Sequence, residues 1–253
     1  MLKVTDLSFA YKNSNKIINE LSISVNSGEC VALLGPNGGG KSTLIKLLAG
    51  VLKPLSGQVI LNGQDISVLE RKRIAQIVAI VYQSPKIYFP YTVEQTVEMG
   101  FYSSGKLFTA PEINNKVTEV LTELDILHLK EKKITEISGG ELQLVFLARS
   151  IVMDTPILFL DEATANLDIN HTIKVLGFLK REVRSKGKTI IAILHDLNLV
   201  PKFADKAMFL SKDSFTTPQN INDAITEENI SKFYNLNKGL FDIQHDLSVL
   251  FKI

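Results

Sequence analysis

The chain has 253 residues, of which 45% are hydrophobic and 22% are charged, and its formal net charge is +1. This composition supports a sizeable buried core and excludes a disordered or fibrous protein. The near balance of basic and acidic residues argues against a nucleic-acid partner, because a general nucleic-acid binder would usually carry a basic stripe. We expect a single domain over residues 1–253.

The sequence predicts no membrane span, because no apolar run approaches the roughly 20 residues that a transmembrane helix needs. The opening residues, Met1–Asp6, lack the apolar core of a signal peptide. The only cysteine, Cys30, lies in an apolar stretch and is typical of a small core residue. We therefore expect a cytoplasmic chain that reaches a membrane only through a partner.

The first third of the chain favours strands. The pattern predicts strands at Ile17–Val25, Glu29–Leu34 and Gln58–Leu61 and a helix at Lys41–Val51. An Asn-Gly pair follows the third strand, and this pair is the strongest short signal for a β-hairpin. These residues indicate an antiparallel β region near the N-terminus.

Strands and helices alternate in the rest of the chain, which predicts a mainly parallel α/β sheet. Residues 84–154 read almost entirely as helix, and we expect them to form a helical lobe inserted into the domain. The tail, residues 215–253, is only weakly patterned. The expected strands are Ile77–Tyr82, Ile157–Leu160 and Thr189–Leu194, and the expected helical stretches are Val93–Leu129, Ser138–Met153 and Ile169–Lys186.

A glycine-rich stretch between a predicted strand and a predicted helix matches G-x-x-x-x-G-K-[ST]. Glycines let the backbone curl closely around phosphate oxygens, and the helix aims its N-terminal N–H groups at them. Lys41 is expected to reach the β- and γ-phosphates, and the Ser42 hydroxyl to ligate Mg²⁺. An ordinary glycine-rich turn is the alternative. The expected ATP-binding residues here are Gly35, Pro36, Asn37, Gly38, Gly39, Gly40, Lys41, Ser42 and Thr43.

Two carboxylates follow the apolar strand Ile157–Leu160, at the edge of an α/β sheet where ligands bind. Asp161 suits the coordination shell of Mg²⁺, and Glu162 suits the base that orients or deprotonates an attacking water. An Asp-Glu pair by itself can simply end a strand. Downstream of a phosphate loop, it predicts a catalytic site.

Residues Ser138–Gln143 read Ser-Gly-Gly-Glu-Leu-Gln. Ser138 and Glu141 fit a capping box at a helix N-terminus. The capping box does not explain two adjacent glycines, which weaken the first helical turn. Glycines are needed there if a phosphate approaches the helix end closely.

With the glycine-rich loop, the Asp-Glu pair and Ser138–Gln143 together, the chain resembles the ATPase subunit of ABC transporters. The resemblance covers nearly the whole sequence. It implies an ABC ATPase fold of the P-loop NTPase class, hydrolysis of ATP with Mg²⁺, and a head-to-tail dimer with a second copy. It also implies that the signature residues contact ATP held by the other copy. Those residues are Ser138, Gly139, Gly140, Glu141 and Gln143.

The resemblance assigns roles to further residues. Tyr11 matches the aromatic that stacks on adenine, Gln83 the loop glutamine near Mg²⁺ and the attacking water, and His195 the switch histidine. Each has a plainer alternative: Tyr11 as a core residue, Gln83 as a polar strand end, and His195 as a buried core histidine. The segment expected to cross the dimer interface is Asn166, Leu167 and Asp168, although Asp168 could also cap the next helix.

Weaker similarities point to one branch, the importers of iron–siderophore complexes, haem and cobalamin. They include Phe89–Val97, Leu194–Leu199, and Thr226–Ile230 followed by Phe233 and Tyr234. The branch implies separate membrane permease subunits, an external substrate-binding protein, and a location on the inner face of the cell membrane. A soluble ABC ATPase acting in assembly, or an exporter subunit, is the alternative.

Overall fold

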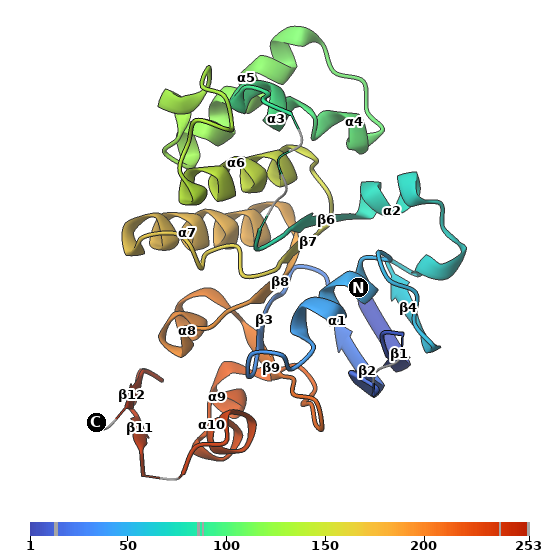
Figure 1. The fold of residues 1–253 in the computed structure, drawn as a ribbon, viewed down its shortest axis with the longest axis vertical. Coiled ribbons are helices and arrows are strands. Elements are labelled where there is room, and N and C mark those ends of the chain that lie inside the picture. The colour runs from blue at the N-terminus through green and yellow to red at the C-terminus, as the bar shows by residue number, and fades with distance from the viewer. Residues whose placement is uncertain (13–14, 85–86, 88, 238, 252–253) are drawn as a thin grey trace. The chain divides into compact units, whose positions relative to one another are not determined.

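The computed structural model describes residues 1–12, 15–84, 87, 89–237 and 239–251. The chain divides into two compact units, which Figure 1 shows in ribbon form. Unit 1 comprises Met1–Leu69 and Thr189–Ile253, and unit 2 comprises Glu70–Lys188. Each unit is described by itself.

Unit 1 begins with an antiparallel sheet in the order β2-β1-β4-β5. The predicted hairpin is confirmed, because Asn62 and Gly63 both have positive φ, at 48° and 78°, between β4 and β5. Positive φ at both positions fits the type of turn whose twist matches the flanking strands. The strands are β1 (Leu2–Phe9), β2 (Ile18–Val25), β4 (Ser56–Leu61) and β5 (Gln64–Asp65).

The second sheet of unit 1 places β3 between two parallel neighbours. The strand β3 (Cys30–Leu34) pairs with β8 (Thr189–Ile193) and β9 (Lys206–Phe209), and all five residues of β3 are buried. Burial on both faces explains the unbroken apolar run of the sequence. The helix α1 (Lys41–Leu48) follows β3 through the glycine-rich loop and ends three residues before its predicted end. The short strand β10 (Gln219–Asn220) is antiparallel to β9.

The tail of unit 1 is packed, which its weak sequence pattern did not predict. Phe233 is buried and stacks on Phe209 of β9, with 5.1 Å between the ring centroids. The C-terminal strands form a two-stranded antiparallel hairpin. The elements are η3 (Leu197–Leu199), α8 (Val200–Phe203), α9 (Ile221–Ala224), α10 (Glu227–Tyr234), β11 (Phe241–Ile243) and β12 (Val249–Phe251).

Unit 2 has two parallel strands, β6 (Val78–Val81) and β7 (Ile157–Leu160). The regular elements described between them are helices, and an unpredicted helix, α2, precedes β6. The lobe boundaries at residues 84 and 154 stay a prediction. The helices of unit 2 are α2 (Arg71–Ile77), α3 (Val93–Glu98), α4 (Phe101–Ser104), α5 (Ala110–Glu123), η2 (Leu127–Leu129), α6 (Gly139–Val152) and α7 (Ile169–Lys186).

The prediction of a continuous helical stretch over Val93–Leu129 is wrong, because the structure divides it into the separate helices α3, α4, α5 and η2. Gly105 follows α4 with a φ of 70°, and Thr109 then opens α5 with a capping box to Glu112. A left-handed glycine ends a helix and a capped threonine starts one, so these residues divide the stretch. The predictions for α6 and α7 are confirmed to within a residue at each end.

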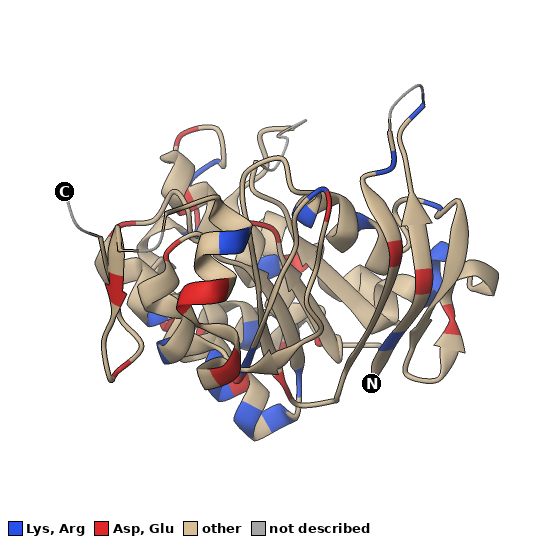
Figure 2. Ribbon diagram, turned by 90° about the horizontal axis from the view of Figure 1, so that it is seen from below, with Lys and Arg blue, Asp and Glu red and all other residues tan. Residues whose placement is uncertain are grey.

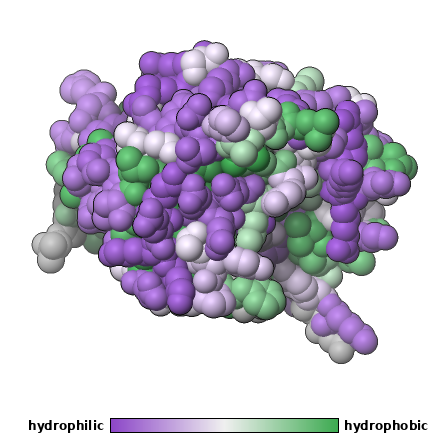
Figure 3. All heavy atoms as spheres, turned by 90° about the horizontal axis from the view of Figure 1, so that it is seen from above, coloured by the Kyte–Doolittle hydropathy of each residue, from purple (hydrophilic) through white to green (hydrophobic). Residues whose placement is uncertain are grey.

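In Figure 2, residues with positive charge (blue) and with negative charge (red) are interspersed along the ribbon. The face drawn in Figure 3 carries apolar residues in small groups among polar ones. Within the residues that the structure describes, no helix combines the length and the apolar character needed to cross a membrane.

Candidate functional site

The glycine-rich loop of unit 1 curls around the ammonium group of Lys41. The Lys41 Nζ atom donates hydrogen bonds to the carbonyl oxygens of Gly35 and Pro36, both at 2.8 Å, and the side chain is only 4% exposed. A buried cation is stable only when its donors are satisfied. The sequence has therefore built a loop that holds a positive charge at its centre, which suits a phosphate ligand.

Glycines allow this loop to form. A Cβ on Gly35, whose φ is 131°, would lie 2.1 Å from the carbonyl oxygen of Leu210. Gly40 precedes α1 with a φ of 95° and has no side chain to cap the helix. An uncapped helix N-terminus directs N–H groups toward an anion. The space around a Cβ on Gly38 is open, so the loop is not covered there by the described residues.

Tyr11 lies beside the first turn of α1. Its hydroxyl is 3.3 Å from Thr43 Oγ1, and its ring meets Phe9 edge to face at 4.9 Å. The residue is 42% exposed, so the alternative interpretation as a core tyrosine is wrong. An exposed aromatic face next to this glycine-rich loop suits stacking with a nucleotide base.

The ends of β6 and β7 bring two predicted catalytic residues together in unit 2. The amide Nε2 of Gln83 donates a hydrogen bond to Glu162 Oε2, and the Asp161 N–H donates to the Val81 carbonyl oxygen at 2.8 Å. Glu162 has a φ of 54°, in the left-handed region that residues other than glycine rarely adopt. The parallel pairing of β6 with β7 places the ends of the two strands side by side, and the Glu162 carboxylate lies within hydrogen-bond distance of Gln83.

A hydrogen bond joins α6, the helix that begins with the signature residues, to the end of β6. Gln143 is 2% exposed, and its Nε2 donates to the carbonyl oxygen of Tyr82 at 2.9 Å. Burial raises the pKa of the Tyr82 hydroxyl, and the nearby Asp161 carboxylate raises it further. The sequence did not predict the contact with Tyr82, because it depends on packing between residues 61 positions apart.

The signature residues open α6 with the expected capping box. Ser138 Oγ accepts from the Glu141 N–H at 3.3 Å, and Glu141 Oε2 accepts from the Ser138 N–H at 2.7 Å. These bonds lower the pKa of Glu141. A Cβ on Gly140 would lie 2.9 Å from the Asn166 carbonyl oxygen, whereas a Cβ on Gly139 would meet no atom within 4 Å. Contact with ATP on another copy stays a prediction.

Asp168 caps α7, as the plainer interpretation expected. Its carboxylate accepts from the His171 N–H at 2.8 Å and lies 2.9 Å from His171 Nδ1. The bond from the His171 N–H, followed by the imidazole contact, lowers the pKa of Asp168. In unit 1, His195 follows β8 and is exposed, so the interpretation as a buried core histidine is wrong.

Comparison with known proteins identifies the family. Residues 18–165 match the family model described as ABC transporter. The chain is 31% identical to the petrobactin import ATP-binding protein YclP of Bacillus subtilis over 81% of each chain. It is 34% identical to the hemin import ATP-binding protein HmuV of Bradyrhizobium diazoefficiens, over 87% of this chain and 84% of that protein. The uncharacterized ABC transporter ATP-binding protein YvrA of Bacillus subtilis is 35% identical over 92% of this chain, which spans only 53% of YvrA.

Solved structures agree with the relatives. An ABC transporter assigned to the metal-chelate type, in an inward-facing conformation, superposes with a TM-score of 0.79 at 28% identity, over 98% of this chain and 94% of that one. The cbiO1 protein of Clostridium perfringens is part of the transporter complex cbiONQ. It superposes with a TM-score of 0.77 at 29% identity, over 94% of this chain and 95% of that one. The chain therefore belongs to the ABC transporter family and is an ABC ATPase.

Proposed function

We propose that the chain is the ATP-hydrolysing subunit of an importer that takes up a metal chelate through a separate membrane permease. The substrate class would be an iron–siderophore complex, haem or cobalamin. The names of YclP and HmuV support this class. The observation that carries the ATP-binding part is the loop that closes on Lys41, with both of its carbonyl contacts at 2.8 Å.

The phosphate loop would bind ATP through charge and backbone donors. Lys41 would exchange its carbonyl acceptors for the β- and γ-phosphate oxygens, and the N-terminal N–H groups of α1 would face the same oxygens. Tyr11 would stack on adenine, since its ring is exposed beside Thr43. The remaining loop residues, Gly35, Pro36, Asn37, Gly38, Gly39, Gly40 and Ser42, would shape the cradle.

The residues proposed for Mg²⁺ fit a hard cation. Ser42, Gln83 and Asp161 offer a hydroxyl, an amide and a carboxylate, which are the oxygen ligands that Mg²⁺ prefers. The Gln83 amide nitrogen faces a Glu162 oxygen, which can only accept, so the Gln83 amide oxygen is the atom suited to a metal. Bound Mg²⁺ would neutralise the charge that develops on the phosphates.

Glu162 would orient and deprotonate the attacking water. The bond from Gln83 limits the rotation of this carboxylate, so the base is held in one direction before ATP arrives. His195 and Lys41 would stabilise charge on the transferred γ-phosphoryl group. Because the backbone of Glu162 has a left-handed conformation, the position of its carboxylate depends on the turn after β7 and not on side-chain rotation alone.

A second copy of the chain would complete each ATP site. Ser138, Gly139, Gly140 and Glu141 would belong to the surface that faces the γ-phosphate on the other copy, and Asn166, Leu167 and Asp168 would cross the interface. The expected contact of Gln143 with that ATP is not kept, because its side chain is 2% exposed and its amide donates to the Tyr82 carbonyl oxygen. Hydrolysis would remove the phosphate that bridges the copies, and the dimer would open. The permease would anchor the dimer on the inner face of the membrane, and an external binding protein would deliver the chelate.

Co-purification tests the transport assignment. The tagged Glu162→Gln variant would be expressed in its own host and extracted gently from membranes with ATP present. We expect a polytopic membrane protein to co-purify, and the direction of transport in vesicles would then separate import from export. Recovery from the cytosol alone, with soluble partners or none, would overturn the transporter assignment and favour an assembly ATPase.

A further inference from the structure

The last residue of α10 reaches the first residue of the phosphate loop. Tyr234 Oη accepts a hydrogen bond from the Gly35 N–H at 3.2 Å, across 199 residues of sequence. Both residues belong to unit 1. The contact therefore connects the tail, for which the sequence predicted no role in nucleotide binding, to the loop proposed to bind phosphate.

This contact fixes a single peptide group from both sides. The carbonyl oxygen of Leu34 accepts from the Leu210 N–H at 2.9 Å, and the N–H of the same peptide group donates to Tyr234. Gly35 has a φ of 131°, in a region that glycine adopts readily and other residues rarely do. Two hydrogen bonds on one peptide group hold a backbone conformation that glycine alone would leave free.

The tyrosine itself is held by aromatic packing. Phe209 stacks on Phe233 and meets the Tyr234 ring edge to face, at 87° and 6.3 Å. Burial raises the pKa of Tyr234, and the Gly35 N–H lowers it by less, so the hydroxyl stays neutral at physiological pH. A neutral phenol oxygen is a suitable acceptor for a backbone N–H.

The same glycine carries an acceptor of Lys41. The Gly35 carbonyl oxygen is 2.8 Å from Lys41 Nζ, so a rotation of the Gly35 backbone moves this contact. We infer that Tyr234 is a positioning residue for nucleotide binding, which fixes the entrance of the phosphate loop through the Gly35 N–H and makes α10 part of the ATP site. The inference rests on the proposed function of the loop.

The test compares two hydroxyl deletions in the full chain. Tyr234→Phe removes the acceptor and keeps the ring, whereas Tyr102→Phe removes a hydroxyl from a residue that is 86% exposed. The probe is ADP with Mg²⁺, which is not hydrolysed. We expect Tyr234→Phe to raise the Kd for ADP roughly two- to tenfold, the worth of one hydrogen bond, and Tyr102→Phe to leave it unchanged.

A second readout is independent of nucleotide. Amide hydrogen exchange by NMR should show faster exchange at Gly35 in Tyr234→Phe, without ADP, because its acceptor is gone. Phe233→Leu is the packing control, since it weakens the stack on Phe209 but keeps the hydroxyl. We expect it to lower Tm with a smaller change in Kd.

The outcomes separate the two proposals. An unchanged Kd and unchanged Gly35 exchange in Tyr234→Phe, with ADP binding weakened in Lys41→Ala, would overturn the inference and leave the proposed function standing. An equal rise of Kd in Phe233→Leu and Tyr234→Phe would also overturn it, because packing alone would explain the effect. Unaltered ADP binding in Lys41→Ala would overturn the proposed function and the inference with it.

Discussion

At the scale of single residues, Glu162 and Gln83 form the hydrogen-bonded pair that we propose as catalytic. The amide of Gln83 donates to the Glu162 carboxylate, and the backbone of Glu162 is held in the left-handed region. Such backbone conformations cost free energy and persist where the surrounding structure maintains them, which is common at functional sites. The pair combines the restrained carboxylate that we propose as the base with a neighbour whose amide oxygen suits a metal.

Replacing Glu162 by glutamine tests the base directly. The new side chain has the same shape, and its oxygen can still accept from Gln83, so we expect the fold and the Kd for ADP to change little. Turnover should fall by about 10²- to 10⁴-fold, because an amide cannot take a proton from water. Steady-state release of phosphate measures the effect.

The matched control is Glu123→Gln, which removes a carboxylate on α5 that pairs with Arg181 at the surface. Its turnover should equal that of the unaltered chain. If Glu162→Gln hydrolysed ATP at a near-normal rate, the carboxylate would have no catalytic role, and another group would have to orient the water.

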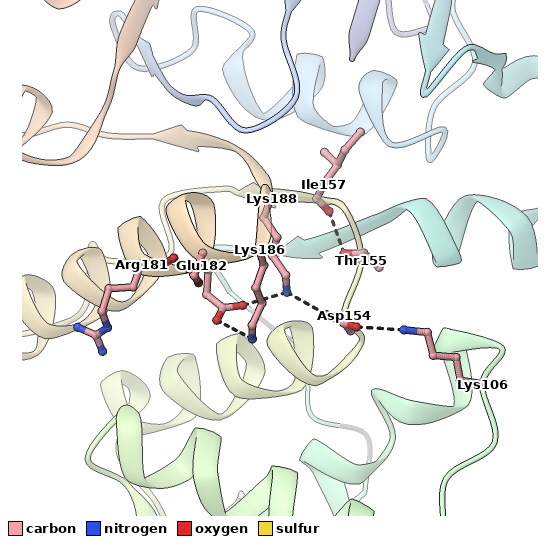
Figure 4. Close-up of polar contacts among 9 residues, drawn as sticks. Lys106, Asp154, Thr155, Ile157, Arg181, Glu182, Lys186 and Lys188 are labelled. Atoms are coloured by element: carbon pink, nitrogen blue, oxygen red, sulfur yellow. Dashed lines mark hydrogen bonds and ion pairs between the residues drawn. The ribbon is translucent and has the colours of Figure 1, made fainter.

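At the scale of elements, a network of charges ties the end of α7 to the loop before β7. Figure 4 shows Glu182 between Lys186 and Lys188, at 2.7 Å and 3.1 Å, with Lys188 also 3.7 Å from Asp154. Lys106 pairs with Asp154 at 3.1 Å. Burial alone would raise the pKa of Asp154, but the bond from Lys106 and the charge of Lys188 bring it below its ordinary value.

Removing the charge of Glu182 should destabilise unit 2. The side chains of Glu182 and Lys188 are each only 7% exposed, so Glu182→Gln leaves a buried ammonium with one carboxylate partner fewer. We expect a loss of about 1–3 kcal/mol in the free energy of unfolding, measured with urea. Lys106→Gln breaks an exposed pair and should cost under about 1 kcal/mol. Equal effects of the two variants would contradict a special role for burial.

The elements also show what the sequence can and cannot predict. The bounds of α7 were correct because Asp168 caps its start and Gly187, with a φ of 66°, ends it. The helix α2 was missed because it begins without a side-chain cap and has only seven residues. Short helices gain their stability from tertiary packing, which leaves little local pattern.

Contacts within the candidate site also depend on tertiary packing, which local sequence patterns do not predict. The motifs indicated that Gln83 and Glu162 act together, but their hydrogen bond depends on β6 lying beside β7, and the residues are 79 positions apart. The bond between Gly35 and Tyr234 spans 199 positions, and no motif predicted that these two residues are in contact. Residue types and loops could be predicted from sequence, whereas strand neighbours and tail packing required the fold.

At the scale of the whole molecule, the signature glycines distinguish what the chain needs to fold from what the proposed dimer needs to work. Within the described residues, a Cβ on Gly140 would press on the Asn166 backbone, but a Cβ on Gly139 would meet nothing within 4 Å. The fold of one copy therefore gives no steric reason for a glycine at position 139. A phosphate held by a second copy would give that reason.

Gly139→Ala should consequently keep or slightly raise Tm, because alanine favours a helix by roughly 0.5–1 kcal/mol over glycine. Its ATPase activity should fall by about tenfold or more, since a methyl group would hold the phosphate away from the N–H groups of α6. Gly177→Ala is the matched control: it lies within α7, also in open space, and should gain stability without losing activity. If both variants hydrolysed ATP equally well, no phosphate would approach Gly139, and the signature helix would serve only to cap and support Gln143.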